Sequence, residues 1–193
     1  MQDLPIELQE EVLFSFKEPE DLARACSVSR GNRQICSDRL FWREKFRREN
    51  LPLLEEGTDA ASWLRIYRKS QRIAQDIDKR LNSASMIDIS LGEIKDPDLL
   101  LPLTQADRVV PYWQSMQRVS FVNFRLQFRP SEIRGKYDYA LLNNFAFGGS
   151  GNLTAATSIR HSLTGSVNTE DLWFILYNIA YYPVEGSIRY MLT

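Results

Sequence analysis

The sequence predicts an α+β fold, in which an all-helical N-terminal module and a trailing helix precede a mixed α+β domain of unknown topology. Short segments of residues 1–50 repeat apolar side chains every three or four positions, which is the period of an amphipathic helix. A longer segment with the same period covers residues 60–81. Beyond residue 82, apolar and polar residues alternate in several segments, and this alternation indicates strands.

The change of pattern near residue 82 is also the expected domain boundary. It divides the chain into a helical module at residues 1–50, a loop and connecting helix at residues 51–82, and an α+β domain at residues 83–193.

Four short helices are expected within the first 50 residues, at residues 2–16, 19–28, 33–37 and 39–50. Helices of one to three turns are not stable alone, so they must pack on one another or on a partner. The residues expected to start them are Asp3 as N-cap with Pro5 in the first turn, Pro19, Ser29 or Asn32, and Ser37 or Asp38.

The helix expected at residues 60–81 has an apolar stripe and a basic cluster. The stripe contains Trp63, Ile66 or Tyr67, Ser70, Ile73 or Ala74, Ile77 and Leu81. The basic cluster contains Arg65, Arg68, Lys69 and Arg72. We interpret this cluster as a solvated face, because acidic residues follow in the same helix, and a phosphate-binding surface is the alternative.

The second half of the chain mixes strand signals with ambiguous segments. Strands are expected at residues 86–91 and 122–128, and residues 94–113, which contain three prolines, are expected to be irregular. Three further segments stay open: residues 137–147 as helix or strand, residues 153–167 as a β-leaning stretch, and residues 170–182 as a helix or buried strand between a Thr169 cap and Pro183. A last strand is expected at residues 187–192.

Composition excludes several classes of partner. The 193 residues are 44% hydrophobic and 25% charged, as in ordinary globular proteins. Lys and Arg total 24 against 25 Asp and Glu, whereas nucleic-acid-binding proteins usually have a basic surplus. The N-terminus has no apolar signal core, and no apolar run approaches the length of a membrane span. We therefore expect no nucleic-acid partner and no membrane partner.

The two cysteines and the single histidine predict no metal site. Structural zinc needs about four ligands, and Cys26, Cys36 and His161 do not supply them. Both cysteines fall among apolar helix positions, so we expect buried free thiols, with a disulfide as the alternative. A reducing compartment would follow from free thiols.

Catalysis has little support in the sequence. His161 has Ser158 and Ser162 nearby, but a nucleophile and a base also need a third group that orients the base. We therefore predict no catalytic residue and no cofactor, and an enzyme that uses His161 is a third hypothesis.

A series of residues over positions 3–47 resembles the F-box family. In order it reads Leu4-Pro5-Ile6-Glu7-Leu8, Val12-Leu13, Phe16, Asp21-Leu22, Val28-Ser29-Arg30, Arg33, Asp38, Leu40 and Trp42. Trp63 and Tyr67 resemble the Trp-x-x-x-Tyr segment that often follows an F-box. Asn32 stands where the family often has Trp. A Trp would bury about 150–250 Å² there, so the packing of the third helix, and with it the affinity for the partner, is the open question at this position.

This resemblance implies an adaptor without enzymatic activity, located in the cytoplasm or nucleus. In the family, the helical element docks onto the Skp-type subunit of a cullin-based ubiquitin ligase, and a second domain captures protein cargo. The resemblance therefore implies both partners for this chain. The expected contact strip is Leu4, Pro5, Leu8, Val12 and Leu13, with support from Leu22, Val28 and Trp42.

Two other interpretations stay open. The same apolar set would serve equally well as a self-contained core, because cores and interfaces share their composition. Alternatively, the protein is a structural or assembly component that uses the F-box-like module as a scaffold contact. Short F-box-like chains of large DNA viruses are similar, and the location would then be the host cell cytoplasm or the virion. Asn32 motivates this second alternative.

Overall fold

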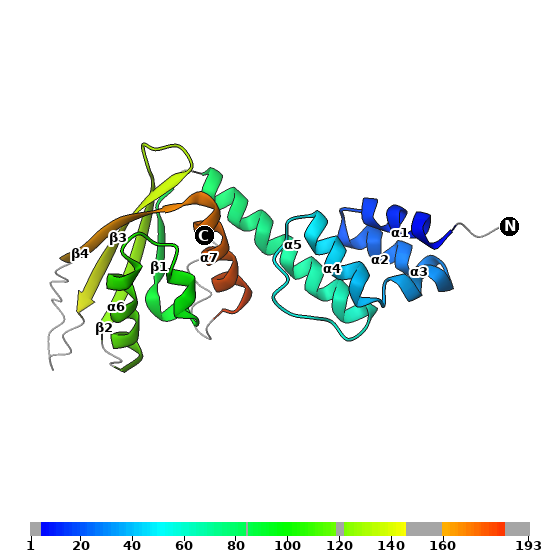
Figure 1. The fold of residues 1–193 in the computed structure, drawn as a ribbon, viewed down its shortest axis with the longest axis horizontal. Coiled ribbons are helices and arrows are strands. Elements are labelled where there is room, and N and C mark those ends of the chain that lie inside the picture. The colour runs from blue at the N-terminus through cyan, green and yellow to red at the C-terminus, as the bar shows by residue number, and fades with distance from the viewer. Residues whose placement is uncertain (1–4, 84, 119–121, 146–159, 184–193) are drawn as a thin grey trace, which may run out of the picture. The chain divides into compact units, whose positions relative to one another are not determined.

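The computed structural model describes residues 5–83, 85–118, 122–145 and 160–183, which are coloured in Figure 1. The chain divides into two compact units, Met1–Gln75 and Asp76–Thr193. Helices form the first unit, and a sheet with helices forms the second, which confirms the predicted α+β class. The division into units falls inside α5 (Ala60–Asn82), and the finer three-part division expected from the sequence stays a prediction.

The first unit contains four short helices, as the sequence predicts, but the third begins at Arg30 rather than at residue 33 and so includes the residues that were expected to interrupt it. They are α1 (Ile6–Ser15), α2 (Pro19–Val28), α3 (Arg30–Ile35) and α4 (Arg39–Arg48), followed by the first part of α5.

The helix starts agree with the sequence at three of the four helices. Pro19 is the first residue of α2, and Ser29 caps α3 through a hydrogen bond from the Asn32 backbone amide of 3.0 Å. Asp38 caps α4 by accepting a 2.8 Å hydrogen bond from the Leu40 amide. For α1 the expected Asp3 cap lies outside the described residues, and Pro5 is the N-cap without a side-chain hydrogen bond.

Aromatic rings from α4 and α5 occupy the centre of the first core. Trp42 stacks on Trp63 with ring centroids 5.9 Å apart and contacts Tyr67 at 5.8 Å. The indole of Trp42 donates a 2.8 Å hydrogen bond to the carbonyl oxygen of Cys36, so its one polar atom is satisfied. The remaining buried residues of this core are Leu13, Leu22, Cys26, Ile35, Cys36, Phe41, Phe46 and Ile66.

The predicted stripe of α5 is buried at Trp63, Ile66, Tyr67, Ser70, Ala74 and Ile77. The basic cluster lies outside this stripe, and Arg68 pairs with Glu20 at 3.0 Å. The prediction of a solvated face is therefore confirmed at Arg65, Arg68 and Arg72, which are exposed.

The second unit contains one antiparallel sheet in the order β1-β2-β3-β4. Its strands are β1 (Ile87–Ser90), β2 (Val122–Pro130), β3 (Lys136–Phe145) and β4 (Arg160–Asn168), so the ambiguous segment at residues 137–147 is a strand. Cross-strand partners share a face of the sheet. The buried face contains Ile87, Ile89, Phe124, Leu126, Phe128, Tyr137, Tyr139, Leu141, Leu163 and Val167.

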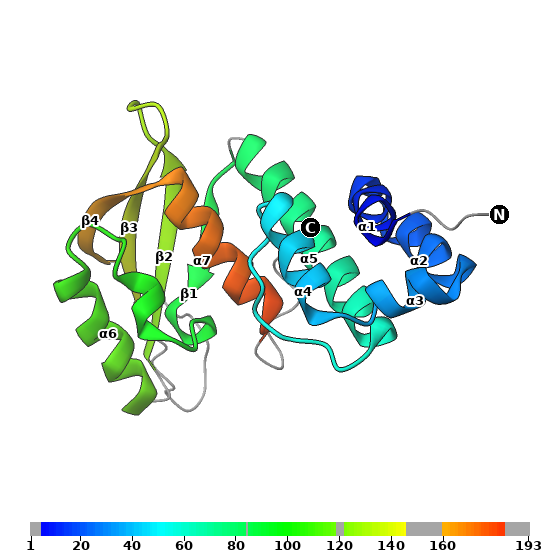
Figure 2. The same cartoon turned by 45° about the vertical axis from the view of Figure 1, so that its right-hand side comes forward.

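Two short 3-10 turns and two helices accompany the sheet. They are η1 (Leu91–Glu93), η2 (Pro97–Leu100), α6 (Ala106–Arg118) and α7 (Thr169–Tyr181), and Figure 2 shows α6 and α7 beside the strands. The segment expected as helix or strand at residues 170–182 is thus helical, and its N-cap is Asn168 rather than Thr169. The strand expected at residues 187–192 lies outside the described residues.

The helix α6 corrects the expectation that residues 94–113 are irregular. Pro111 lies inside it and removes a backbone hydrogen bond, a change that costs about 3 kcal/mol in a helix interior. Tertiary contacts offset this cost, because the Tyr112 ring lies 4.9 Å from the Phe124 ring and the Trp113 indole donates to the Ile94 carbonyl at 2.7 Å. Local sequence does not show such contacts.

Gly165 lies where the sheet edge meets the segment before α6. Thr104 binds the backbone of Ser166 on β4, and the Tyr139 hydroxyl donates to the Thr104 carbonyl. A Cβ atom at Gly165 would lie 2.6 Å from the Tyr139 hydroxyl and 2.5 Å from the Thr104 hydroxyl. Only glycine leaves room for this close approach.

Replacing Gly165 with alanine is therefore expected to lower the unfolding free energy of the second unit by about 1–3 kcal/mol, through overpacking. Chemical denaturation followed by circular dichroism measures the change. Thr164→Ser, at the exposed neighbouring position, serves as the control and is expected to stay within about 0.5 kcal/mol of the unaltered protein. Equal stability of Gly165→Ala and the unaltered protein would contradict the close contact.

Candidate partner-binding surface

Large apolar side chains of α1, α2 and α4 remain exposed although the first core is filled. Leu8 and Val12 are 52% and 51% exposed, and they lie four residues apart on one face of α1. Val28, at the end of α2, is 80% exposed, and Leu40, at the start of α4, is 69% exposed. We call Leu8, Val12, Val28 and Leu40 the exposed apolar set.

The structure divides the predicted contact residues into two groups. Pro5, Leu8, Val12 and Val28 are exposed, whereas Leu13, Leu22 and Trp42 are buried in the core. Leu4 lies outside the described residues. Which of these residues contact a partner therefore stays a prediction.

Two exposed apolar residues, Ile6 and Leu40, are missing from the predicted contact strip. Both belong to the quoted series of residues, so a signal for them existed. Hydrophobic period alone cannot show which apolar residue a neighbouring helix leaves uncovered, because that depends on how the helices pack.

The helix α1 ends on a buried ammonium group from α4. The Lys45 side chain is fully buried, and its Nζ donates to the Phe14 carbonyl at 3.0 Å and to the Phe16 carbonyl. It also pairs with Glu49 at 2.7 Å. The last carbonyls of a helix have no partner within the helix and favour a cation, so Lys45 satisfies them.

A hydroxyl and an amide from α5 extend this cluster. The Tyr67 hydroxyl donates to Glu49 Oε2 at 2.7 Å, and burial together with that carboxylate raises the pKa of Tyr67. Gln71 Nε2 donates to the Tyr67 oxygen and to the Lys17 carbonyl, each at 2.7 Å. The resulting polar cluster joins the end of α1 to both α4 and α5.

A second, exposed contact joins α1 to α4. The Arg48 guanidinium pairs with Glu11 and with Glu44, each at 2.7 Å, and lies 4.1 Å from the centroid of the Phe14 ring. Hydrogen bonds from Arg47 and Arg48 lower the pKa of Glu44 to about 2, and the Arg48 bond lowers the pKa of Glu11.

Comparison with known proteins concerns this helical part of the chain. Residues 1–48 match the family model described as F-box-like. The N-terminal module is an F-box-like domain. Such domains generally bind Skp-type proteins and are typically non-catalytic adaptors. Searches of the curated proteins and of the solved structures gave no match for this chain.

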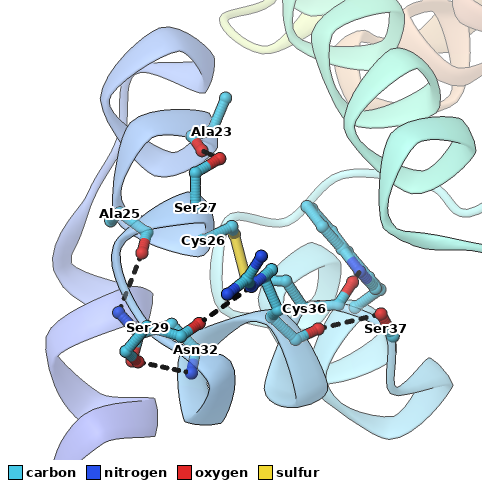
Figure 3. The surroundings of a disulfide bond; sticks show 10 residues. Ala23, Ala25, Cys26, Ser27, Ser29, Asn32, Cys36 and Ser37 are labelled. Atoms are coloured by element: carbon cyan, nitrogen blue, oxygen red, sulfur yellow. Dashed lines mark hydrogen bonds between the residues drawn. A yellow bond between two sulfur atoms is a disulfide. The ribbon is translucent and has the colours of Figure 1, made fainter.

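The two cysteines of the F-box-like domain form a disulfide, as Figure 3 shows. The expectation of free thiols is therefore wrong, although both residues are buried as predicted. The turn between α2 and α3 brings the Cα atoms of Cys26 and Cys36 to 5.9 Å, within the range that a disulfide spans. The inference of a reducing compartment loses its basis, because it followed from free thiols.

Asn32 makes a polar contact at the position where the family often has Trp. Its Nδ2 donates a 2.8 Å hydrogen bond to the Ala25 carbonyl, which joins α3 to α2 (Figure 3). The disulfide lies beside this contact. A covalent bond and a hydrogen bond thus hold α3 against α2, in a place where an indole would supply apolar contact area.

The face of the sheet that contains Gln127 and Arg129 is a second candidate surface. A hollow of ≈ 560 Å³ opens along β2, β3 and β4, where Ala140 and Ser166 have small side chains. Gln127 also lines it, as do Arg129 and Asp138, which face each other in the strand register. Arg129 and Asp138 are both exposed, so this face offers both charges to a polar ligand.

The described residues also bear on catalytic, metal-binding and membrane roles. His161 belongs to β4, but its side chain is outside the described part, so the enzyme hypothesis stays untested. Among the described residues, no three His, Cys, Asp or Glu side chains gather as a metal-binding group. Within the same residues, no helix is long and apolar enough to cross a membrane.

Replacing Lys45 with methionine is expected to lower the unfolding free energy of the first unit by about 3 kcal/mol, because Glu49 and two carbonyls lose a buried cationic partner. Urea denaturation monitored by tryptophan fluorescence measures this loss. Lys17→Met makes the same chemical change at an exposed position and is expected to alter stability by less than about 0.5 kcal/mol. A similarly small effect at Lys45 would contradict the role of the buried cluster.

The Glu44 carboxyl is expected to titrate near pH 2, and Arg48→Gln is expected to raise the pKa of both Glu44 and Glu11 toward 4.5. Folding lowers these pKa values, so the ion pairs stabilise the fold above pH 4.5 and lose their contribution as the pH falls toward 2. Carboxyl carbon chemical shifts followed by NMR measure each titration. A pKa of Glu44 near 4.5 in the unaltered protein would show that the pairs do not form.

Proposed function

We propose that the protein is an adaptor of an SCF-type ubiquitin ligase, and that its F-box-like domain binds the Skp-type subunit and through it the cullin complex. One observation supports this most directly. The core of the domain is complete without Leu8, Val12 and Val28, which remain exposed beside it. Exposed apolar residues of this size mark sites that another protein covers.

The proposed contact residues follow from exposure. Pro5, Leu8, Val12, Val28 and Leu40 contact the Skp-type protein directly. The buried residues Leu13, Leu22 and Trp42 act through packing, because they position the helices that present the exposed apolar set. Leu4 belongs to the proposed contact by its place before Pro5 in the series.

The proposal assigns protein cargo to the second unit. Its support is the hollow along β2, β3 and β4, which combines hydroxyl, amide and charged groups from three strands. Extended segments and loops of another protein have the same mixture of polar groups. The proposal therefore separates the two tasks: the helical domain binds the ligase and the sheet binds cargo.

The alternative proposal is a structural or assembly protein, in which the exposed apolar set contacts a scaffold or another copy of the chain. It uses the same residues, so the two proposals differ only in the partner. The partner's identity therefore decides between them.

The double substitution Leu8→Asp and Val12→Asp is expected to weaken binding to a purified Skp-type protein by at least about tenfold, because it places two charges in an apolar contact. Isothermal titration calorimetry measures the affinity, and circular dichroism checks that the variant stays folded. Both side chains are about half exposed, so the fold is expected to tolerate the change.

The matched control is Leu101→Asp with Ile133→Asp, which adds the same charges at exposed positions of the second unit. Unaltered affinity is expected for this control. No binding by the unaltered protein, or equal binding by the Leu8 and Val12 variant, would refute the adaptor proposal. A homo-oligomer that the Leu8 and Val12 variant dissociates, seen in sedimentation, would support the assembly alternative instead.

A further inference from the structure

The corner between α2 and α3 combines noncovalent contacts with the one covalent crosslink among the described residues. The helix α3 has six residues, too few for a stable helix by itself. Ile35 anchors it in the core, and Asn32 donates to the Ala25 carbonyl. The Cys26–Cys36 disulfide is the covalent connection, and the Cys36 carbonyl in turn accepts the indole hydrogen bond of Trp42.

This disulfide lies close in sequence to two members of the exposed apolar set. Val28 follows Cys26 by two residues, and Leu40 follows Cys36 by four. The chain between these two exposed side chains contains α3, and the bond closes the part of it up to Cys36 into a loop. Because α3 connects the end of α2 to the start of α4, it is the element whose position would change how Val28 and Leu40 are arranged.

We propose that the Cys26–Cys36 disulfide is a redox-sensitive crosslink that controls partner binding by the F-box-like domain. In the oxidised state it holds α3 against α2, and the exposed apolar set has one arrangement. In the reduced state α3 opens more often, and the affinity for the partner falls. The effect on affinity rests on the proposed function, whereas the effect on α3 does not.

The reduction has a defined course with a dithiol as reductant. Both cysteines are buried, so a thiolate of the dithiol attacks one sulfur, here Cys26 Sγ, after α3 has opened. A mixed disulfide forms, and the Cys36 thiolate leaves and takes up a proton. The second thiolate then attacks the reductant's own sulfur, which releases Cys26 as a thiol. Two electrons and two protons reach the protein, and the dithiol becomes a cyclic disulfide.

Burial of both sulfurs makes the opening of α3 a step before the attack. The reduced state contains two thiols of nearly unchanged volume, so the apolar surroundings still suit them. Loss of the crosslink therefore affects the position of α3 and the order of residues 30–36 more than the rest of the core. This local effect is what an experiment on the folded chain can measure.

The test compares the full chain before and after reduction by dithiothreitol. Hydrogen exchange measured by mass spectrometry is expected to become faster at the amides of residues 30–36, on the order of tenfold. Calorimetry with a purified Skp-type protein is expected to show an affinity for the reduced chain that is about tenfold weaker. That loss corresponds to about a tenth of the reduced molecules having the arrangement that binds the partner.

The control is the double variant Cys26→Ser and Cys36→Ser, with Cys26→Ala and Cys36→Val as a second pair of apolar replacements. Each folded variant is expected to have the hydrogen exchange and the affinity of the reduced protein, and dithiothreitol is expected to change neither. Any effect of dithiothreitol on a variant's binding would then come from the partner's own thiols. Exchange at residues 30–36 that reduction leaves unchanged would overturn the proposal, whatever the partner does.

The two proposals fail in different ways. Equal affinity of the oxidised and reduced chains would overturn redox control while the adaptor function stands. Absence of binding in both states, with faster exchange after reduction, would refute the adaptor function and still support the crosslink's hold on α3.

Discussion

The contact between the Lys45 ammonium and the end of α1 is the interaction on which the first unit most depends. Leu13 is the one fully buried residue of α1, and Phe14 adds a ring stacked on Phe41 at 4.7 Å. Lys45 adds hydrogen bonds to carbonyls that no helical amide reaches, and Glu49 balances its charge. A buried cation is favourable only when its partners are complete, which ties α1, α4 and α5 to one relative arrangement.

This polar attachment explains how α1 stays in place while it exposes Leu8 and Val12. The last carbonyl groups of α1 accept hydrogen bonds from Lys45, and Glu11 of α1 forms an ion pair with Arg48 of α4. Polar contacts at its C-terminal half thus leave the apolar face of α1 available, which is what a docking helix requires.

The sequence predicted those features that depend on local pattern. Pro19 and Asp38 marked helix starts correctly, and alternation at residues 122–128 identified β2, because caps and periodicity act over a few residues. Features that depend on distant segments were missed. The contacts that stabilise α6 around Pro111, and those that bury Lys45, arise from residues far apart in the chain. The contact residues stay a prediction, and the division of Leu8 from Leu13 into surface and core depends on how the helices pack.

The disulfide bears on the question that Asn32 raises. The sequence left the packing of α3 open, because an amide replaces a large aromatic side chain. The structure holds α3 by a hydrogen bond from that amide and by a covalent bond beside it. Apolar contact area acts in any redox environment, whereas a disulfide acts only where it stays oxidised. Because a disulfide takes the place of apolar contact area here, how firmly α3 is held against α2 depends on the redox state. Val28 precedes α3 in the chain, and Leu40 follows it.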